Sequence, residues 1–489
     1  MVAHPWPKPF RQQKTTHYTS IKRLTNTQPH HPANPNSHRY SASFLRSNEL
    51  PKKQAEFYKE KPGFFSTTAI VRHCRFVILD CEQGGLSDCG LTKSFSAPQR
   101  CLTFTLSVLM LRHDFLGNET GSHEIAIRVR SMVRIGIVGI GFMGWTHFSG
   151  ATKFTEDGKI TGSKLKGAAV TAICTRSPEK LIGDWRSIQG NFGPRGANLD
   201  LTEISSYDNY REMIKDPDID LIDICLPNDQ HEKVAIDALE AGKHVIVEKP
   251  IALDPKAADR MIAASKKTGK LLMVAHVLPF FPEFKFAAEA ISSGKYGKLR
   301  AAHFRRVISP PKWSSDMSDF QRLGGWGIDL HIHDNHFISL ACGVPKQVFS
   351  RGILEGGFVN HVHTQYVYED MSYAVSAVSG GIAAEGLAFA SGFELFLEKA
   401  TLMYSAGTVA GQWCADRALT VIENGKAKQP KLKGGSEWCS AFTSELQMAV
   451  DGVRSGQVPE LLSAELARAA LKMCHAEARS IAAGKAIPV

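Results

Sequence analysis

The 489-residue sequence lacks an apolar run long enough to span a membrane. A membrane helix needs about 20 consecutive apolar residues, and the best candidate covers only residues 101–111. That run also lies too far from Met1 to act as a secretory signal. Cysteine is sparse after residue 131, where six are scattered without a C-x-x-C pair. This argues against a zinc knuckle and a disulfide framework, and it favours a reducing compartment, the cytoplasm.

The bulk of the chain also lacks an excess of charge. Residues 132–489 contain 40 Lys and Arg against 39 Asp and Glu, whereas residues 1–131 contain 18 against 9. Residues 132–489 therefore show no electrostatic sign of nucleic-acid binding, and the charge of residues 1–131 is too diffuse to favour it. Stretches such as "NTQPHHPANPNSHRYSAS" have no apolar period, so we expect residues 1–131 to form a poorly ordered leader. It is either translated from upstream of a natural start at Met132 or a disordered tail, with a targeting segment as the competing interpretation.

Strands and helices are predicted to alternate from Met132 onward. Apolar strand-like runs are "VRIGIVG", "AAVTAICT", "DLIDICLP" and "HVIVEKP", and "HEKVAIDALEAGK" has helical spacing. This pattern predicts a doubly wound parallel sheet over residues 132–254. Residues 255–489 change to helices and alternating runs such as "TQYVYEDMSYAVSAVSGG", which predict a mainly antiparallel sheet with one covered face, followed by a closing helix.

A glycine motif follows the first predicted strand. In "GIGFMG", Gly139, Gly141 and Gly144 have the G-x-G-x-x-G spacing. Such glycines allow a tight turn and a close approach to a pyrophosphate, and the next helix points its N–H groups at the phosphates. The motif alone is weak, but here it follows a strand and begins a β-α-β series, which is the context that supports dinucleotide binding.

The end of the second strand bears on the choice of cofactor. NAD-binding domains usually have Asp or Glu there to bind the ribose hydroxyls, whereas this chain has Thr175, Arg176 and Ser177. Hydroxyls and a guanidinium can donate hydrogen bonds to a 2′-phosphate, whereas a carboxylate would repel it. We therefore expect NADP to be preferred, with NAD as the alternative.

The order and spacing of "GIGFMG", "LPNDQH", "AGKHVIVEKP" and "GGWGIDLHIHD" resemble the Gfo/Idh/MocA oxidoreductases over residues 132–489. The resemblance implies an N-terminal Rossmann dinucleotide-binding domain and a C-terminal α/β domain with a large open, mainly antiparallel sheet. It also implies hydride transfer between a nicotinamide and a hydroxyl or keto carbon of a sugar, cyclitol or related diol. Members often use the open sheet to form homodimers or homotetramers, and no nucleic acid or membrane partner is expected.

The segment "GGWGIDLHIHDNH" is read as one helix. Asp329 and His333 are then four residues apart and share a face, His336 roughly joins that face, and His331 points away. The residues alone leave three interpretations, namely proton transfer, a polar solvated helix, and a metal site of Asp329, His333 and His336. The family resemblance supports proton transfer, with His333 as acid/base and Asp329 orienting it, so no metal is expected. The resemblance departs at His336, where members often have Asp.

Lys249 matches the lysine of the family's E-K-P element and would hold the substrate oxygen. The resemblance also implies a cis bond before Pro250. Asn228 and His231 are expected to border the nicotinamide pocket, although helix capping explains Asn228 equally well. The motifs and the resemblance together predict a cofactor-binding set of Gly139, Gly141, Phe142, Met143, Gly144, Thr175, Arg176, Ser177, Pro227, Asn228, His231, Glu248 and Lys249.

Two other functions remain open for this sequence. Some relatives hydrolyse glycosides through transient oxidation by tightly bound NAD, and cofactor that is not consumed would favour that reaction. A non-catalytic NAD(P)-binding regulator is the other alternative. The retention of Lys249, Asp329 and His333 counts against the regulator, since a sensor has no need of a proton-transfer set.

Overall fold

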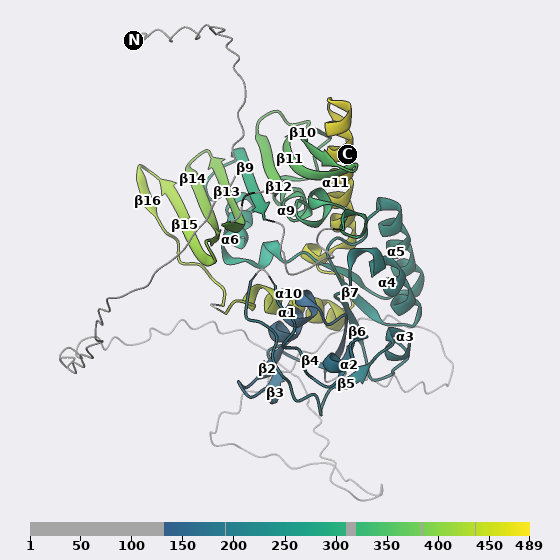
Figure 1. Cartoon of the computed structure of the whole chain (residues 1–489). Coiled ribbons are helices and arrows are strands. Elements are labelled where there is room, and N and C mark those ends of the chain that lie inside the picture. The colour runs from purple at the N-terminus through teal and green to yellow at the C-terminus, as the bar shows by residue number, and fades with distance from the viewer. Residues whose placement is uncertain (1–131, 191, 310–318, 383, 385, 436) are drawn as a thin grey trace, which may run out of the picture. The chain divides into compact units, whose positions relative to one another are not determined.

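The structure is a computed structural model that describes residues 132–489 except 191, 310–318, 383, 385 and 436 (Figure 1). The leader predicted for residues 1–131 therefore lies outside the described residues. Two sheets of six and nine strands dominate the described part of the chain, and a short hairpin forms a third.

The first sheet is wholly parallel, as predicted, and has the strand order β5-β4-β1-β6-β7-β8. Its strands are β1 (Val133–Val138), β4 (Ala168–Cys174), β5 (Ser205–Tyr207), β6 (Leu221–Ile224), β7 (His244–Glu248) and β8 (Leu272–Ala275). The hairpin of β2 (Thr152–Phe154) and β3 (Ile160–Ser163) follows the first helix. The apolar runs that were read as strands are β1, β4, β6 and β7, which are nearly continuously buried because helices cover both faces.

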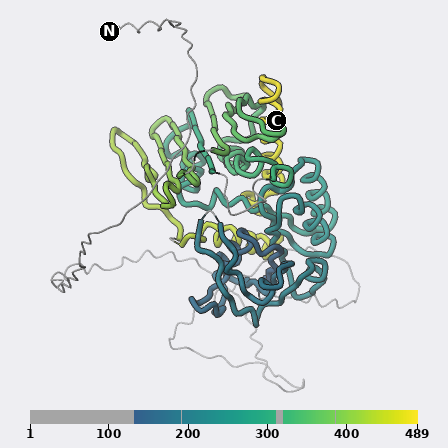
Figure 2. The backbone as a smooth tube through the Cα atoms, in the orientation of Figure 1, coloured from purple at the N-terminus to yellow at the C-terminus, as the bar shows by residue number. Residues whose placement is uncertain are grey.

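The two faces of this sheet are covered by different helices. On one face, Ile222, Ile224 and Val247 pack with residues of α4 (His231–Glu240), α5 (Pro255–Thr268) and α11 (Ala464–Ala483). On the other, Leu221 and Ile246 pack with residues of α1 (Phe142–Ala151) and α10 (Ser440–Ser455). The tube in Figure 2 shows that α10, from near the C-terminus, lies beside α1, from near residue 142. The parallel sheet is therefore completed by helices from both ends of the described chain.

The second sheet is mainly antiparallel, as predicted. Its order is β16-β15-β14-β13-β9-β12-β11-β10-β17, and its one parallel pair in the described residues is β9 with β12. The strands are β9 (Leu299–Ile308), β10 (Gln347–Glu355), β11 (Phe358–Val367), β12 (Ala374–Gly381), β13 (Leu387–Leu397), β14 (Ala400–Val409), β15 (Gln412–Glu423), β16 (Lys426–Lys428) and β17 (Ile487–Pro488).

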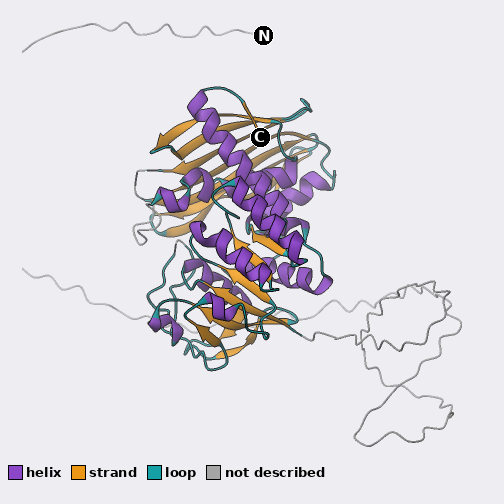
Figure 3. Cartoon of the chain, turned by 90° about the vertical axis from the view of Figure 1, so that its right-hand side faces the viewer, coloured by secondary structure: helices purple, strands orange, loops and turns teal. Residues whose placement is uncertain are grey.

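One face of this second sheet is covered by helices, as Figure 3 shows. α6 (Pro282–Ser292), α9 (Ile332–Cys342) and α11 bury their apolar side chains against it. Along β11, buried Thr364 and Tyr366 alternate with exposed Gln365 and Val367, so the opposite face stays exposed. The shorter elements are α2 (Pro178–Leu181), α3 (Tyr210–Met213), η1 (Asn228–Gln230), η2 (Leu278–Phe280), α7 (Phe320–Leu323), α8 (Trp326–Asp329) and η4 (Glu460–Leu462).

The division into domains after residue 254 stays a prediction, but two elements beyond it belong to the parallel sheet layer. β8 is the last strand of that sheet, and α5 packs on its face. The predicted boundary at residue 254 precedes these two elements because it was set where the sequence pattern changes. A helix and one more strand of the same sheet follow that change. Across the described residues, every helix is too short or too polar to cross a membrane.

Candidate active site

The glycine turn lies between β1 and α1, and each glycine meets different surroundings. Gly139 has φ of +100°, and a Cβ there would lie 2.6 Å from the carbonyl oxygen of Cys225. A Cβ on Gly144 would lie 2.1 Å from the carbonyl oxygen of Gly139, so helix and turn approach closely. A Cβ on Gly141 would meet no atom within 4 Å. The turn thus has the tight bend, the close packing and the open space that a pyrophosphate requires.

The side chains of Phe142 and Met143, which follow this turn, pack against neighbouring residues. The ring of Phe142 lies edge-on to Phe192 with centroids 4.8 Å apart, and Met143 packs against the core on the α1 side of the sheet. Their backbone N–H groups begin α1, since the first intrahelical bond runs from Trp145 N to Gly141 O at 2.9 Å. The contribution that these residues can offer a phosphate is therefore their main chain.

The end of β4 carries hydroxyls, an exposed guanidinium and a nearby carboxylate. Arg176 is exposed, and Thr175 is held to β5 by a backbone bond to Tyr207. Ser177 caps α2 and donates a 2.7 Å hydrogen bond to the Glu179 carboxylate. Glu179, which was not considered from the sequence, places a negative charge two residues beyond Ser177, where the 2′-phosphate of NADP was expected to bind.

Lys249 and Asp329 are joined across the two halves of the described chain. The Lys249 ammonium donates to the backbone oxygen of Asp329 at 2.7 Å and to its Oδ1 at 3.2 Å. Asn228 donates to Oδ1 of Asp329 at 3.4 Å and to the backbone oxygen of Leu323 at 3.0 Å. Lys249 follows β7, and the peptide bond before Pro250 is cis, as the resemblance implied. The predicted residues Lys249, Asp329 and Asn228 thus lie together at the carboxyl ends of parallel strands.

The histidine segment is not one helix, so the expectation of a continuous Asp329–His333 face is wrong. α8 ends at Asp329 and α9 begins at Ile332, and the N–H of His331 bonds back five residues to the oxygen of Trp326. This break removes the i, i+4 relation. In the described residues no hydrogen bond joins Asp329 to His333, and Asp329 is bonded to Lys249 instead.

His333 lies near several cations and has no carboxylate partner in the described residues. It is partly buried, with its Nδ1 enclosed and without a hydrogen-bond partner there. Burial holds the pKa of His333 well below its usual value, and Lys249 and Arg306 lower it further. Arg306 is itself fixed by a buried ion pair with Asp334 at 2.9 Å. The imidazole is therefore neutral at neutral pH and ready to accept a proton.

His331, which was predicted to point away from Asp329 and His333, is fully buried. Its Nε2 lies 3.0 Å from the Glu477 carboxylate and 3.2 Å from the Tyr366 hydroxyl. Burial opposes its charge, but the charge of Glu477, its hydrogen bond to His331 and the charge of Asp334 together outweigh this and raise the pKa of His331. The sequence analysis had no signal for Glu477, which lies 146 positions away on α11.

His336 is also turned away from a metal arrangement with Asp329. Its ring stacks on that of His276 with centroids 3.9 Å apart and an interplanar angle of 4°. Burial lowers the pKa of His336 to about 3. His276, directly after β8, also lies edge-on to His333 with centroids 6.3 Å apart. Sequence reasoning missed His276, although its position at the end of an apolar strand was a usable signal.

His231 is enclosed by backbone rather than open to a pocket. Its two ring nitrogens each lie 2.8 Å from a carbonyl oxygen, those of Pro250 and Leu226. It therefore fixes the loop that carries Pro227 to the segment that follows Lys249, and both its nitrogens are occupied. Glu248 faces inward as well, and its Oε2 accepts a 3.0 Å hydrogen bond from the backbone N–H of Lys249.

Comparison with known proteins relates the parallel-sheet region to one family. Residues 133–276 match the model of an oxidoreductase family with an NAD-binding Rossmann fold, the Gfo/Idh/MocA family. The inositol 2-dehydrogenase/D-chiro-inositol 3-dehydrogenase of Lactiplantibacillus plantarum is 29% identical over 221 residues, which are 44% of this chain and 57% of that protein. The 1,5-anhydro-D-fructose reductase of Ensifer adhaerens is 31% identical over 187 residues, which are 38% of this chain and 52% of that protein.

A solved structure extends the likeness to the second sheet. The apo scyllo-inositol dehydrogenase of Lactobacillus casei superposes with a TM-score of 0.52 at 20% sequence identity, over 73% of this chain and 98% of that one. At this identity the likeness shows the fold alone. In sequence, the chain spans about half the length of the curated relatives that it matches.

Proposed function

We propose that this chain is a Gfo/Idh/MocA oxidoreductase, because residues 133–276 match the model of that family. We propose that it transfers a hydride between a nicotinamide cofactor and a CH–OH or keto carbon of a sugar, cyclitol or related diol. The observation that carries the proposal is the pairing of Lys249 with Asp329, with His333 near its ammonium, where ligands bind an open parallel sheet. The inositol dehydrogenase and anhydrofructose reductase named above support the substrate class.

Lys249 would hold the reacting oxygen. Its ammonium has three N–H donors, and two of them are taken by the backbone oxygen and Oδ1 of Asp329. The third is available to a substrate hydroxyl or carbonyl. Asp329 thereby orients Lys249 rather than His333, which changes the role that the sequence suggested for it. A positive charge beside the oxygen would stabilise the negative charge that develops there during oxidation.

His333 would move the proton of the same hydroxyl. Because burial and the neighbouring cations favour its neutral form, it is present as a base well below pH 6.5. The acid limb of the oxidation rate should therefore have its midpoint below the ordinary histidine pKa of about 6.5.

The glycine turn fits a dinucleotide, since Gly141 leaves open space and Gly144 brings the helix close to the strand. A nicotinamide cofactor, when bound, would supply or accept the hydride. We propose NADP as the preferred cofactor, supported by Thr175, Arg176 and Ser177 at the end of β4 and opposed by the charge of Glu179.

We further propose that the open face of the nine-stranded sheet mediates a homodimer or homotetramer. Large apolar side chains are exposed on its strands β13 to β15, including Phe396, Val409 and Trp413. The six cysteines of the described residues are unpaired, which suits the reducing cytoplasm.

The test is a panel of sugars, inositols and their keto forms, with reduced cofactor followed by absorbance. We expect stoichiometric change in cofactor with at least one polyol, and its loss in Lys249→Ala and His333→Ala. Glycoside cleavage without net cofactor change would replace this proposal with the hydrolase alternative. Cofactor binding without turnover of any panel member would favour the regulator.

A further inference from the structure

An ionisable side chain lies in the middle of a buried parallel strand. All four residues of β6 are buried, and Asp223 is 0% exposed. Side chains alternate along a strand, so Asp223 lies on the face that Leu221 and Cys225 share, under α1 and α10. On β7 the same alternation puts Glu248 on the side of Ile246. Two carboxylates and a thiol from neighbouring strands therefore point to one side of the sheet.

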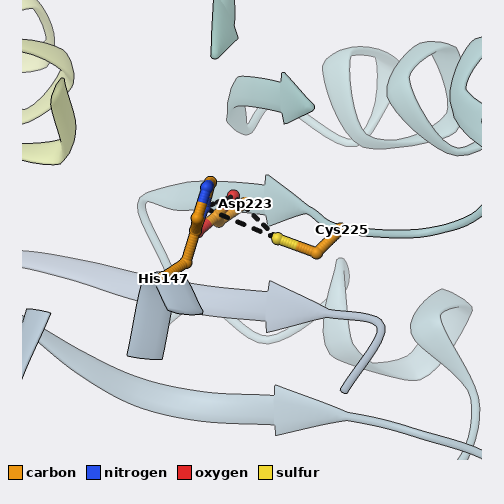
Figure 4. A group of neighbouring side chains, drawn as sticks. All are labelled: His147, Asp223 and Cys225. Atoms are coloured by element: carbon orange, nitrogen blue, oxygen red, sulfur yellow. Dashed lines mark hydrogen bonds and ion pairs between the residues drawn. The ribbon is translucent and has the colours of Figure 1, made fainter. Parts of the chain in front are cut away.

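α1 adds an imidazole to this group, as Figure 4 shows. Nδ1 of His147 lies 2.9 and 3.1 Å from the two carboxylate oxygens of Asp223, and Nε2 lies 2.9 Å from Oε1 of Glu248. Sγ of Cys225 is 3.5 Å from Nδ1 of His147 and 3.6 Å from Oδ1 of Asp223. His147 is 0% exposed, so water does not screen these charges.

α10 brings a third carboxyl, that of Glu445. It is 0% exposed, and neither of its oxygens has a hydrogen-bond partner in the described residues. Burial raises the pKa of Glu445 well above its usual value; the charge of His147 lowers it, and those of Glu248 and Asp223 raise it. Burial opposes a charge on His147, but Asp223 and Cys225 together outweigh this and raise its pKa.

The charges of the group do not balance without a further cation. In the described residues, the imidazole of His147 is the one side chain able to carry positive charge that contacts these carboxylates. One imidazolium can neutralise a single carboxylate, whereas Asp223 and Glu248 are two. Buried charges are ordinarily paired or bound to metals, and a divalent cation would supply what is missing.

We propose that His147, Asp223 and Cys225 bind a divalent metal ion, with zinc as the best match. A tetrahedral zinc with bonds of about 2.3 Å to sulfur and about 2.0–2.1 Å to nitrogen or oxygen separates a sulfur from a neighbouring ligand atom by about 3.5 Å. The two distances from Cys225 are 3.5 and 3.6 Å. Binding would release protons from Nδ1 of His147 and the Cys225 thiol, and no atom changes oxidation state.

Glu248 would hold His147 in place without binding the metal itself. Metal-bound histidines usually donate their other N–H to a carboxylate, and Nε2 of His147 faces Glu248 at 2.9 Å. Since His147, Asp223 and Cys225 are all buried between the sheet and α1, the site would be structural rather than catalytic. It would steady the end of β7, because Glu248 also accepts the backbone N–H of Lys249. The site departs from the sequence expectation of no metal, and it does not use the histidines of the GGWGIDLHIHDNH segment.

The test is the metal content of the full chain, purified without chelator and measured by mass spectrometry. We expect about one zinc per chain, and in the cobalt-substituted protein a thiolate-to-cobalt charge-transfer band in the near ultraviolet. Cys225→Ser should lose the band, and Asp223→Asn should lower zinc occupancy. Cys174→Ser is the matched control, because Cys174 is a buried thiol on the opposite face of the same sheet.

Three results would overturn the site. They are a well-folded chain that takes up neither zinc nor cobalt, a cobalt complex without the thiolate band, and a Cys225→Ser protein that keeps both zinc and the band. The first of these would mean that the hydrogen bonds of His147 to Asp223 and Glu248 hold the group without a metal. These measurements use no substrate, so they stand whether or not the proposed oxidoreductase activity is found.

Discussion

His331 and His333 are two residues apart and should respond in opposite ways to the same substitution. His331→Ala removes the charge partner of Glu477, whose carboxylate is 1% exposed. Removing one member of a buried ion pair leaves the other charge without a partner, which lowers the free energy of unfolding by about 3–5 kcal/mol. Tyr366 and Asn335 still donate to Glu477, so the lower figure is the better expectation.

A loss of about 3 kcal/mol should lower the melting temperature by roughly 6–12 °C, at about 2–4 °C per kcal/mol for a domain of moderate size. His333→Ala should leave the melting temperature nearly unchanged, because its enclosed Nδ1 has no partner among the described residues. Its turnover should fall by roughly 10²–10⁴-fold. Circular dichroism melting and cofactor absorbance, measured on both variants, separate the two effects.

The double variant His331→Ala/Glu477→Gln is the control. It removes the unpaired charge, so it should cost less than the sum of its single changes. The reasoning fails if His331→Ala melts like the unaltered chain, or if His333→Ala loses as much stability as His331→Ala.

The remaining predictions concern the cofactor and the response to acid. Arg176→Ala should reduce the ratio of NADP to NAD affinity in fluorescence titrations, and Ser177→Asp should move it toward NAD; equal or tighter NAD binding in the unaltered chain would refute the preference. Gly141→Ala should fold normally but bind cofactor weakly, because a Cβ on Gly141 meets no protein atom within 4 Å. Gly144→Ala should melt at a lower temperature, because its Cβ would lie 2.1 Å from the backbone oxygen of Gly139. The unfolded chain protonates His336 near pH 6.5 and the folded chain only near pH 3, so stability should fall as the pH drops through this window. His336→Phe should flatten that fall in denaturant titrations.

The architecture could be predicted because it depends on local patterns. Continuous apolar runs gave β1, β4, β6 and β7, and alternation gave the antiparallel pairing of β11 with β12. Lys249 and Asp329 could be named from their motifs. Their direct contact could not, since it joins residues 80 positions apart.

The histidine segment shows where sequence periodicity is insufficient. Counting four residues from Asp329 assumes an unbroken helix, and the break between α8 and α9 depends on how Trp326 and Leu330 pack. The burial of His331 depends on Glu477, on a helix whose docking no local pattern reports. The group around His147 was missed for the same reason, although Asp223 interrupts an otherwise apolar strand and was a visible signal.

The packing of α10 and α11 has a consequence for the order of folding during synthesis. Leu446, Ala449 and Val450 complete the core on one face of the parallel sheet, and Ala470 and Leu471 complete it on the other. A ribosome releases these residues about 200 positions after β7. Until then, both faces of that sheet expose apolar side chains, so the nascent chain would depend on chaperones or on a provisional collapse. A nucleotide-binding unit excised at residue 276 should for the same reason aggregate, unless these two helices are supplied as well.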